Sequence, residues 1–176
     1  MRSRRILLAI AGLLLAGGVS IVVATGWGHA TAAASPAPVD GADPLRANLY
    51  PDSDRAPADL ADALTRASRE HKRVLVDFGG NWCGDCRVLD IYFHDPANQA
   101  LLNASYVLVR VNVGELDRNE DLAAKYGIPI QKGVPALLIL GSDGQVVYRQ
   151  HTGEAEAMSR VAGPASVHEF LERWKS

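Results

Sequence analysis

Residues 76–86 have the sequence Val-Asp-Phe-Gly-Gly-Asn-Trp-Cys-Gly-Asp-Cys. The stretch completes a short, β-branched apolar run over residues 74–78, which predicts a buried central strand. Two glycines and an asparagine break the strand, and a helix is expected over residues 83–93. The cysteines therefore stand where a strand leads into a helix. Unpaired backbone N–H groups and a partial positive charge at a helix start stabilise a thiolate, which predicts a reactive sulfur at Cys83.

Cys83 and Cys86 are the only cysteines in the chain. A disulfide between them closes a very small loop and removes little entropy from the unfolded chain, so a redox role is favoured over an inert structural disulfide. We expect Cys83 to be the exposed nucleophile and Cys86, one helical turn further on, to be the buried resolving cysteine. A zinc site needs about four ligands, and the histidines are scattered, so no metal site is expected.

Helices and strands alternate along the rest of the chain. The apolar patterns predict an α/β fold whose central mixed sheet is flanked by helices on both faces. Helices are expected at 57–71, 83–93, 95–102 and 119–126 and after a capping box at 166–169, and strands at 74–78, 106–113, 136–140 and 146–148.

Three segments carry a resemblance to the thioredoxin family. Residues 76–86 resemble its active-site segment, and Gly133-Val134-Pro135-Ala136-Leu137 resembles its cis-proline loop. Tyr126-Gly127-Ile128 resembles the segment just before that loop. The similarity covers residues 57–176 in the family's order of elements. It implies the thioredoxin fold and a thiol–disulfide oxidoreductase that needs no organic cofactor beyond the Cys83–Cys86 pair.

The resemblance also implies roles for four further residues. Asp77 matches a buried acid that assists proton transfer at the second cysteine, and burial would raise its pKa toward neutral. Pro135 matches the cis-proline packed against the disulfide, and Val134 would offer its backbone to an extended substrate strand. Trp82 would shield the sulfurs. The alternatives are that Asp77 is a plain strand-end acid and Pro135 a trans proline.

Two features depart from typical thioredoxins. Gly84 and Asp85 separate the cysteines, where thioredoxins have Gly-Pro, and residues 127–133 form a longer approach to the predicted cis-proline. In both features the sequence resembles exported thioredoxin-like proteins more than cytosolic thioredoxin. The first affects the redox potential and the second the choice of partner.

The N-terminus has the pattern of a targeting segment. Arg2, Arg4 and Arg5 precede an uncharged stretch over residues 6–28, and residues 30–34 fit an A-x-A cleavage site. We expect residues 1–34 to be a signal peptide or a retained membrane anchor, and either places the domain outside the cytoplasm. Residues 35–56 are expected to be a linker. Membrane contact is expected only through this N-terminal segment.

Charge limits the possible partners. The net charge is −2 and no Lys/Arg-rich run follows residue 5, which argues against nucleic-acid binding. The leading hypothesis is an extracytoplasmic reductase whose partners are cysteine-containing exported proteins and an electron donor in the membrane. The alternatives are a net disulfide oxidant or isomerase, and a non-catalytic thioredoxin-fold binding or chaperone module.

Overall fold

The computed structural model describes residues 48–157 and 163–175. These residues belong to one unit of the chain, Asp40–Ser176. The predicted signal or anchor at residues 1–34 and most of the predicted linker lie outside the described residues. Among the helices of the described part, none is long and apolar enough to cross a membrane.

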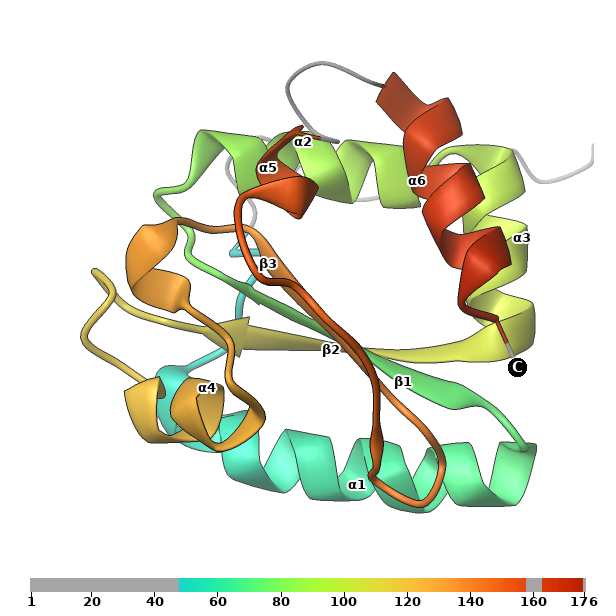
Figure 1. Cartoon of the computed structure of the whole chain (residues 1–176), viewed down its shortest axis with the longest axis horizontal. Coiled ribbons are helices and arrows are strands. Elements are labelled where there is room, and N and C mark those ends of the chain that lie inside the picture. The colour runs from blue at the N-terminus through green and yellow to red at the C-terminus, as the bar shows by residue number, and fades with distance from the viewer. Residues whose placement is uncertain (1–47, 158–162, 176) are drawn as a thin grey trace, which may run out of the picture. The chain divides into compact units, whose positions relative to one another are not determined.

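Four strands form one mixed sheet in the order β2-β1-β3-β4 (Figure 1). β1 pairs in parallel with β2, whereas the β1–β3 and β3–β4 pairs are antiparallel. The two central strands, β1 and β3, are buried almost throughout because both faces of the sheet are covered. The strands are β1 (Arg73–Gly79), β2 (Tyr106–Asn112), β3 (Ala136–Leu140) and β4 (Val146–Arg149).

Helices cover both faces of the sheet, which confirms the predicted fold class (Figure 1). One face packs against α1 (Ala56–Glu70) and α4 (Glu120–Tyr126). The other face packs against α2 (Gly84–Phe93), α3 (Pro96–Ser105), α5 (Glu154–Ala157) and α6 (Gly163–Arg173). Two 3-10 turns, η1 (Ser53–Arg55) and η2 (Ile130–Lys132), complete the described fold.

Alternation along β1 divides the core between the two faces. Val74, Val76 and Phe78 point into the cluster that includes α1, and Leu75 points into the cluster that includes α2, α3 and α6. Asp77 follows the same alternation, so a carboxyl group is placed at the carboxyl end of a central strand. That end of the sheet is where α2 begins.

Two predicted boundaries need correction. The linker was expected to extend to residue 56, but Tyr50 is only 2% exposed and packs in the core, so the folded domain begins before residue 57. The final helix was expected to start at the Ser166 capping box, but α6 already begins at Gly163. Val167 and Leu171 of this helix are fully buried.

Candidate active site

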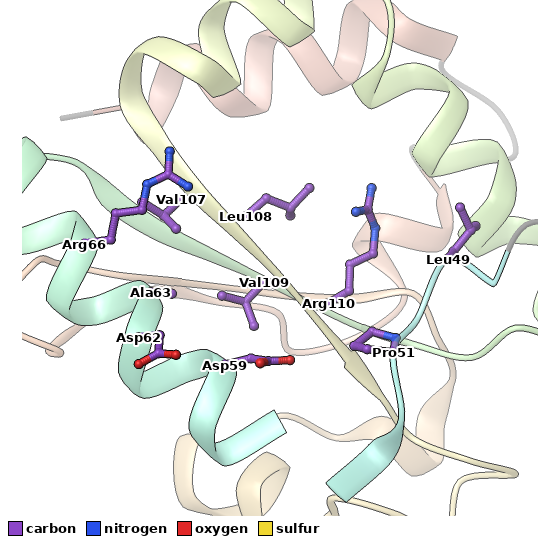
Figure 2. A pocket seen from close by; sticks show the side chains of 10 residues that line it. All are labelled: Leu49, Pro51, Asp59, Asp62, Ala63, Arg66, Val107, Leu108, Val109 and Arg110. Atoms are coloured by element: carbon purple, nitrogen blue, oxygen red, sulfur yellow. The ribbon is translucent and has the colours of Figure 1, made fainter. Parts of the chain in front are cut away.

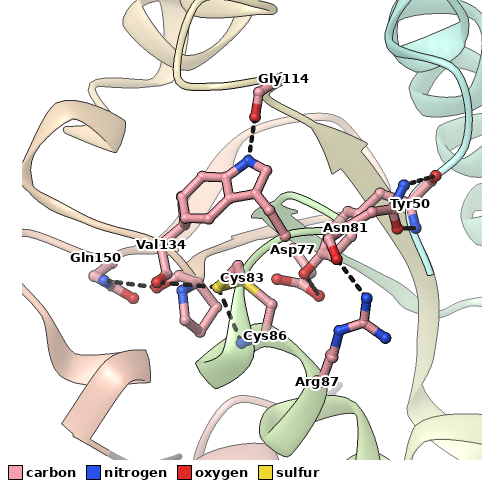
Figure 3. Close-up of a disulfide and its surroundings, with 11 residues drawn as sticks. Tyr50, Asp77, Asn81, Cys83, Cys86, Arg87, Gly114, Val134 and Gln150 are labelled. Atoms are coloured by element: carbon pink, nitrogen blue, oxygen red, sulfur yellow. Dashed lines mark hydrogen bonds between the residues drawn. A yellow bond between two sulfur atoms is a disulfide. The ribbon is translucent and has the colours of Figure 1, made fainter. Parts of the chain in front are cut away.

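The two cysteines form a disulfide at the start of α2 (Figure 3). Cys83 is the N-cap residue of this helix, and the backbone N–H of Cys86 donates to Cys83 Sγ at 3.1 Å. A hydrogen bond and a helix start both favour negative charge on the atom they face. Cys83 Sγ is therefore the sulfur that this geometry would stabilise as a thiolate.

Both sulfur-bearing residues are buried. Cys83 is 4% exposed and Cys86 is 1% exposed. The expected contrast between an exposed and a buried cysteine is therefore small, and that part of the prediction is wrong. The cause is that residues of the cis-proline loop pack over the disulfide. Val134 is itself only 7% exposed, and its carbonyl oxygen lies 3.5 Å from Cys83 Sγ.

The Val134–Pro135 peptide bond is cis, as the resemblance predicts. A buried side chain, Gln150, holds the loop from behind: its Nε2 donates to the Pro135 carbonyl at 3.4 Å, and its Oε1 accepts from the backbone N–H of Leu137 at 3.1 Å. The same oxygen accepts from the N–H of Ala155 at 3.2 Å. Gln150 thus fixes the loop to β3 and α5. The predicted substrate contacts of Val134 and Pro135 stay predictions.

Trp82 lies beside the disulfide with half of its surface exposed (Figure 3). Its indole N–H donates to the carbonyl oxygen of Gly114 at 2.6 Å, in the loop that follows β2. The ring is therefore fixed at one end while much of it stays open to solvent. An exposed aromatic ring next to the sulfurs suits contact with a substrate, and its predicted shielding role stays a prediction.

Asp77 is fully enclosed by the fold, with 1% of its surface exposed. Burial raises the pKa of this carboxyl to about 6, while Arg110 and a hydrogen bond from Tyr50 act in the opposite direction. Within the described part of the chain, Asp77 Oδ1 has no hydrogen-bond partner. A buried carboxyl that titrates near neutrality and keeps one oxygen unpaired is suited to exchange a proton, so the arrangement fits the predicted role.

Tyr50 is a site residue that the sequence analysis missed, as it missed Gln150 and Arg110. Its hydroxyl donates to Asp77 Oδ2 at 2.9 Å, although the two residues are 27 positions apart (Figure 3). The backbone around Tyr50, residues 49–53, crosses the end of β1 and β2, and we call this segment the strap. Nothing in the local sequence indicated a site residue, because the pattern around Pro51 is that of a turn or linker.

Gly79 creates the space where these groups meet. A Cβ at this position would lie under 3.0 Å from both the phenolic oxygen of Tyr50 and Cys86 Sγ. Tyr50 and Cys86 therefore both approach the same point of β1. A side chain at position 79 would push one of them away, so the close approach of the strap to the disulfide requires glycine here.

Arg110 brings a positive charge to this region. It stands opposite Asp77 in the register of β2 against β1, and its guanidinium forms a short ion pair with Asp90 of α2. Arg110 also lines a cleft of about 370 Å³ between the strap, α1 and β2 (Figure 2). That cleft includes neither cysteine, and its walls carry both acidic and basic side chains. We assign it no chemistry.

The described residues contain no cluster of three or more histidine, cysteine or acidic side chains that could hold a metal ion. The groups near the sulfurs include the phenol of Tyr50 and the carboxyl of Asp77 that it bonds (Figure 3). The site therefore offers proton transfer and thiolate chemistry from the chain's own residues.

Comparison with known proteins agrees with this geometry. Residues 55–142 match the sequence profile of a family described as thioredoxin-like. The chain belongs to the thioredoxin-like family. In structure it is similar to a disulphide isomerase from Xylella fastidiosa, with a TM-score of 0.68 and 36% identity over 72% of this chain and 96% of that one.

Two curated relatives are similar over part of their length. A thiol:disulfide interchange protein DsbD from Pseudomonas fluorescens is 28% identical over 68% of this chain and 19% of its own length. A protein disulfide-isomerase from Ricinus communis is 33% identical over 59% of this chain and 21% of its own length. The chain thus spans about a fifth of the length of these relatives.

Proposed function

We propose that this chain is a thiol–disulfide oxidoreductase that reduces disulfides of exported proteins outside the cytoplasm. The observation that carries the proposal is the hydrogen bond from the Cys86 N–H to Cys83 Sγ at the first turn of α2. The buried Asp77 belongs to the same region, because its partner Tyr50 and Cys86 Sγ meet at Gly79. This arrangement supplies a stabilised nucleophile and a proton acceptor, which are the two groups that disulfide exchange needs. Relatives named for disulfide interchange and isomerisation support the same chemistry.

The reaction would proceed in two exchanges. The Cys83 thiolate attacks one sulfur of the substrate disulfide, that S–S bond breaks, and one substrate thiolate leaves. The Cys86 thiol then gives its proton to the Asp77 carboxylate, and the Cys86 thiolate attacks Cys83 Sγ. The mixed disulfide breaks and the second substrate thiolate leaves. Two electrons pass to the substrate, and the chain is left with the Cys83–Cys86 disulfide.

The reducing direction is argued from the residues around Cys83. Asp85 lies in the first turn of α2, and a carboxylate there repels a thiolate at Cys83, which favours the disulfide form. The helix start and the Cys86 N–H act in the opposite direction. We expect these effects nearly to cancel and to give a potential of roughly −230 to −280 mV, near that of thioredoxin.

A reductase in an oxidising compartment needs a continuous source of electrons. We therefore propose an electron donor in the membrane and cysteine-containing exported proteins as substrates. No organic cofactor is required, because the cysteine pair itself carries the two electrons.

Equilibration of the full chain against glutathione and dithiothreitol buffers tests the direction. A potential between −230 and −280 mV, with reduction of insulin disulfides at the expense of dithiothreitol, would support the reductase. A potential near −120 mV would refute it and favour a net oxidant. If Cys83→Ser kept a binding or chaperone activity intact, the non-catalytic alternative would replace the oxidoreductase.

An isomerase is the second candidate, because relatives carrying that name are similar to this chain. Refolding of a protein with scrambled disulfides separates the two functions. An isomerase would restore native pairing with a catalytic amount of chain and no net change in thiol content. A reductase would consume its own dithiol and stop.

The location rests on the N-terminal sequence pattern, with its arginines before an uncharged stretch. Fusion of residues 1–47 to alkaline phosphatase, which is active only outside the cytoplasm, tests it. We expect an active fusion, and an inactive one when Arg2, Arg4 and Arg5 are replaced by glutamate. Cell fractionation of the same fusion, with the size of the mature protein, separates a cleaved signal from a retained anchor.

A further inference from the structure

Hydrogen bonds from asparagine side chains hold the strap at the end of the sheet. Asn81 makes two reciprocal bonds with Tyr50: its Oδ1 accepts from the Tyr50 N–H at 3.0 Å, and its Nδ2 donates to the Tyr50 carbonyl at 3.1 Å. Asn112 Nδ2 donates to the Pro51 carbonyl at 2.9 Å. Asn119 Nδ2 donates to the Ser53 carbonyl at 2.9 Å. Four backbone groups of a short segment are thus held by side chains that lie at least 31 residues away in sequence.

This fastening places one side chain deep in the site. Tyr50 is 2% exposed, and its hydroxyl donates to Asp77 Oδ2 at 2.9 Å. The hydroxyl lies over Gly79, in the space that Cys86 Sγ also approaches. A phenol hydroxyl that is buried away from water needs a hydrogen-bond partner, and the partner of Tyr50 is a carboxyl group. Ordinary core packing would be served equally well by phenylalanine. We therefore assign the hydroxyl a role at Asp77, the carboxyl group to which it donates.

We propose that Tyr50 is the positioning residue for Asp77: its hydroxyl holds Oδ2 and leaves Oδ1 as the oxygen that exchanges a proton with Cys86. This inference rests on the proposed function and assigns the two oxygens of the carboxyl different tasks. The proton moves between Cys86 Sγ and Asp77 Oδ1, while the phenolic proton stays on Tyr50. Burial and the neighbouring Asp77 carboxylate raise the pKa of Tyr50 well above its usual range, which keeps that proton in place.

The charged groups around the carboxyl are few. Burial raises the pKa of Asp77 most, Arg110 on β2 and the Tyr50 hydroxyl lower it, and Asp90 on α2 raises it. Cys86 faces the same region from α2 and titrates only in the reduced protein. Removal of the hydroxyl would leave a desolvated carboxylate with neither oxygen hydrogen-bonded, so the charged form would be less favourable.

The test compares Tyr50→Phe with Tyr106→Phe in the full chain. Tyr106 is the matched control, because its buried hydroxyl also makes one hydrogen bond, to the Leu171 carbonyl at 2.7 Å, at the far end of β2. The first readout is the titration of the Asp77 side-chain carbon by NMR in the disulfide form, where neither cysteine titrates. We expect the midpoint to rise by about one pH unit in Tyr50→Phe and to stay unchanged in Tyr106→Phe.

The second readout is the rate at which Cys86 resolves a mixed disulfide at pH 6. A rise of one unit from a pKa of about 6 reduces the ionised fraction of Asp77 from about one half to a tenth, so this rate should fall about fivefold. An unchanged Asp77 midpoint in a folded Tyr50→Phe, or an equal shift in Tyr106→Phe, would overturn the proposal. If the wild-type chain exchanged no disulfides, the proposed function would fail, while the titration in the disulfide form would still decide the role of Tyr50.

Discussion

Arg110 stands opposite Asp77 across the parallel pair β1–β2, yet its guanidinium forms its ion pair with Asp90 of α2. The positive charge therefore acts on two carboxyl groups: it forms an ion pair with Asp90 and lowers the pKa of Asp77. Arg110 thus ties the active-site helix to the sheet and also adjusts the acid behind the disulfide. These two effects can be separated by substitution.

Arg110→Leu should raise the midpoint of Asp77 titration, because a nearby positive charge is lost and Asp90 is left unbalanced. It should also lower the free energy of unfolding by about 1–3 kcal/mol, since a half-buried carboxylate loses its partner. NMR titration and urea unfolding measure the two effects. Arg66→Leu is the control, because Arg66 forms an exposed pair with Glu70 on α1. This substitution should change the Asp77 midpoint and the free energy of unfolding little. A lower Asp77 midpoint in Arg110→Leu would contradict this account.

The disulfide site could be predicted from the sequence because its signals are local. The cysteines, the strand before them and the Val-Pro pair before β3 each lie within a few residues of the feature they indicate. The structure places all of them around the same sulfur atoms, with Val134 carbonyl 3.5 Å from Cys83 Sγ. Fold class follows similarly, since the buried runs of β1 and β3 carry the pattern of central strands.

The strap could not be predicted in this way. The hydroxyl of Tyr50 acts on a residue 27 positions away, and its backbone is held by Asn81, 31 positions away. Periodicity describes which face of an element is apolar, and the strap is neither helix nor strand. The start of α6 was missed for a different reason: Ser166 and Glu169 form a local capping pattern, but the helix extends three residues further toward the N-terminus.

Asp77→Asn should stabilise the protein at alkaline pH and slow its turnover. The folded pKa of Asp77, about 6, lies above the ordinary value of 3.8. A carboxyl with a raised folded pKa favours the fold below pH 3.8, and this contribution is lost as the pH rises through 6. At pH 8 the wild type therefore contains a buried carboxylate, and asparagine should increase the free energy of unfolding by about 1–3 kcal/mol.

Urea unfolding of both proteins at pH 4 and pH 8 measures this difference. The stability gained by Asp77→Asn should be small at pH 4 and larger at pH 8. An equal gain at both values would mean that the ionisation of Asp77 is not its cause. Disulfide exchange by Asp77→Asn that matched the wild type from pH 6 to pH 8 would remove Asp77 from the mechanism.

The two cysteines should differ in trapping experiments although both are buried. Cys86→Ser keeps the nucleophile, so it should accumulate a mixed disulfide with a substrate protein. Cys83→Ser should form little, because the sulfur that accepts the N–H at the start of α2 is gone. Mass spectrometry of the trapped adducts, and alkylation of the reduced wild type near pH 6, give the order of reactivity. Stronger trapping or faster labelling at Cys86 would reverse the assignment.

Asp85→His should make the cysteine pair more oxidising. The carboxylate of Asp85 stands in the same helical turn as Cys83 and disfavours its thiolate, whereas an imidazole removes this repulsion and adds a hydrogen-bond donor. A thiolate stabilised tenfold raises the potential by about 30 mV, and we expect at least this shift in glutathione equilibration. Asp121→His is the control, because Asp121 occupies the first turn of α4 on the other face of the sheet and should leave the potential unchanged. A potential that stayed constant or became more reducing in Asp85→His would show that Asp85 does not set the direction of exchange, and the reducing character would then have to come from the packing of Val134 against Cys83.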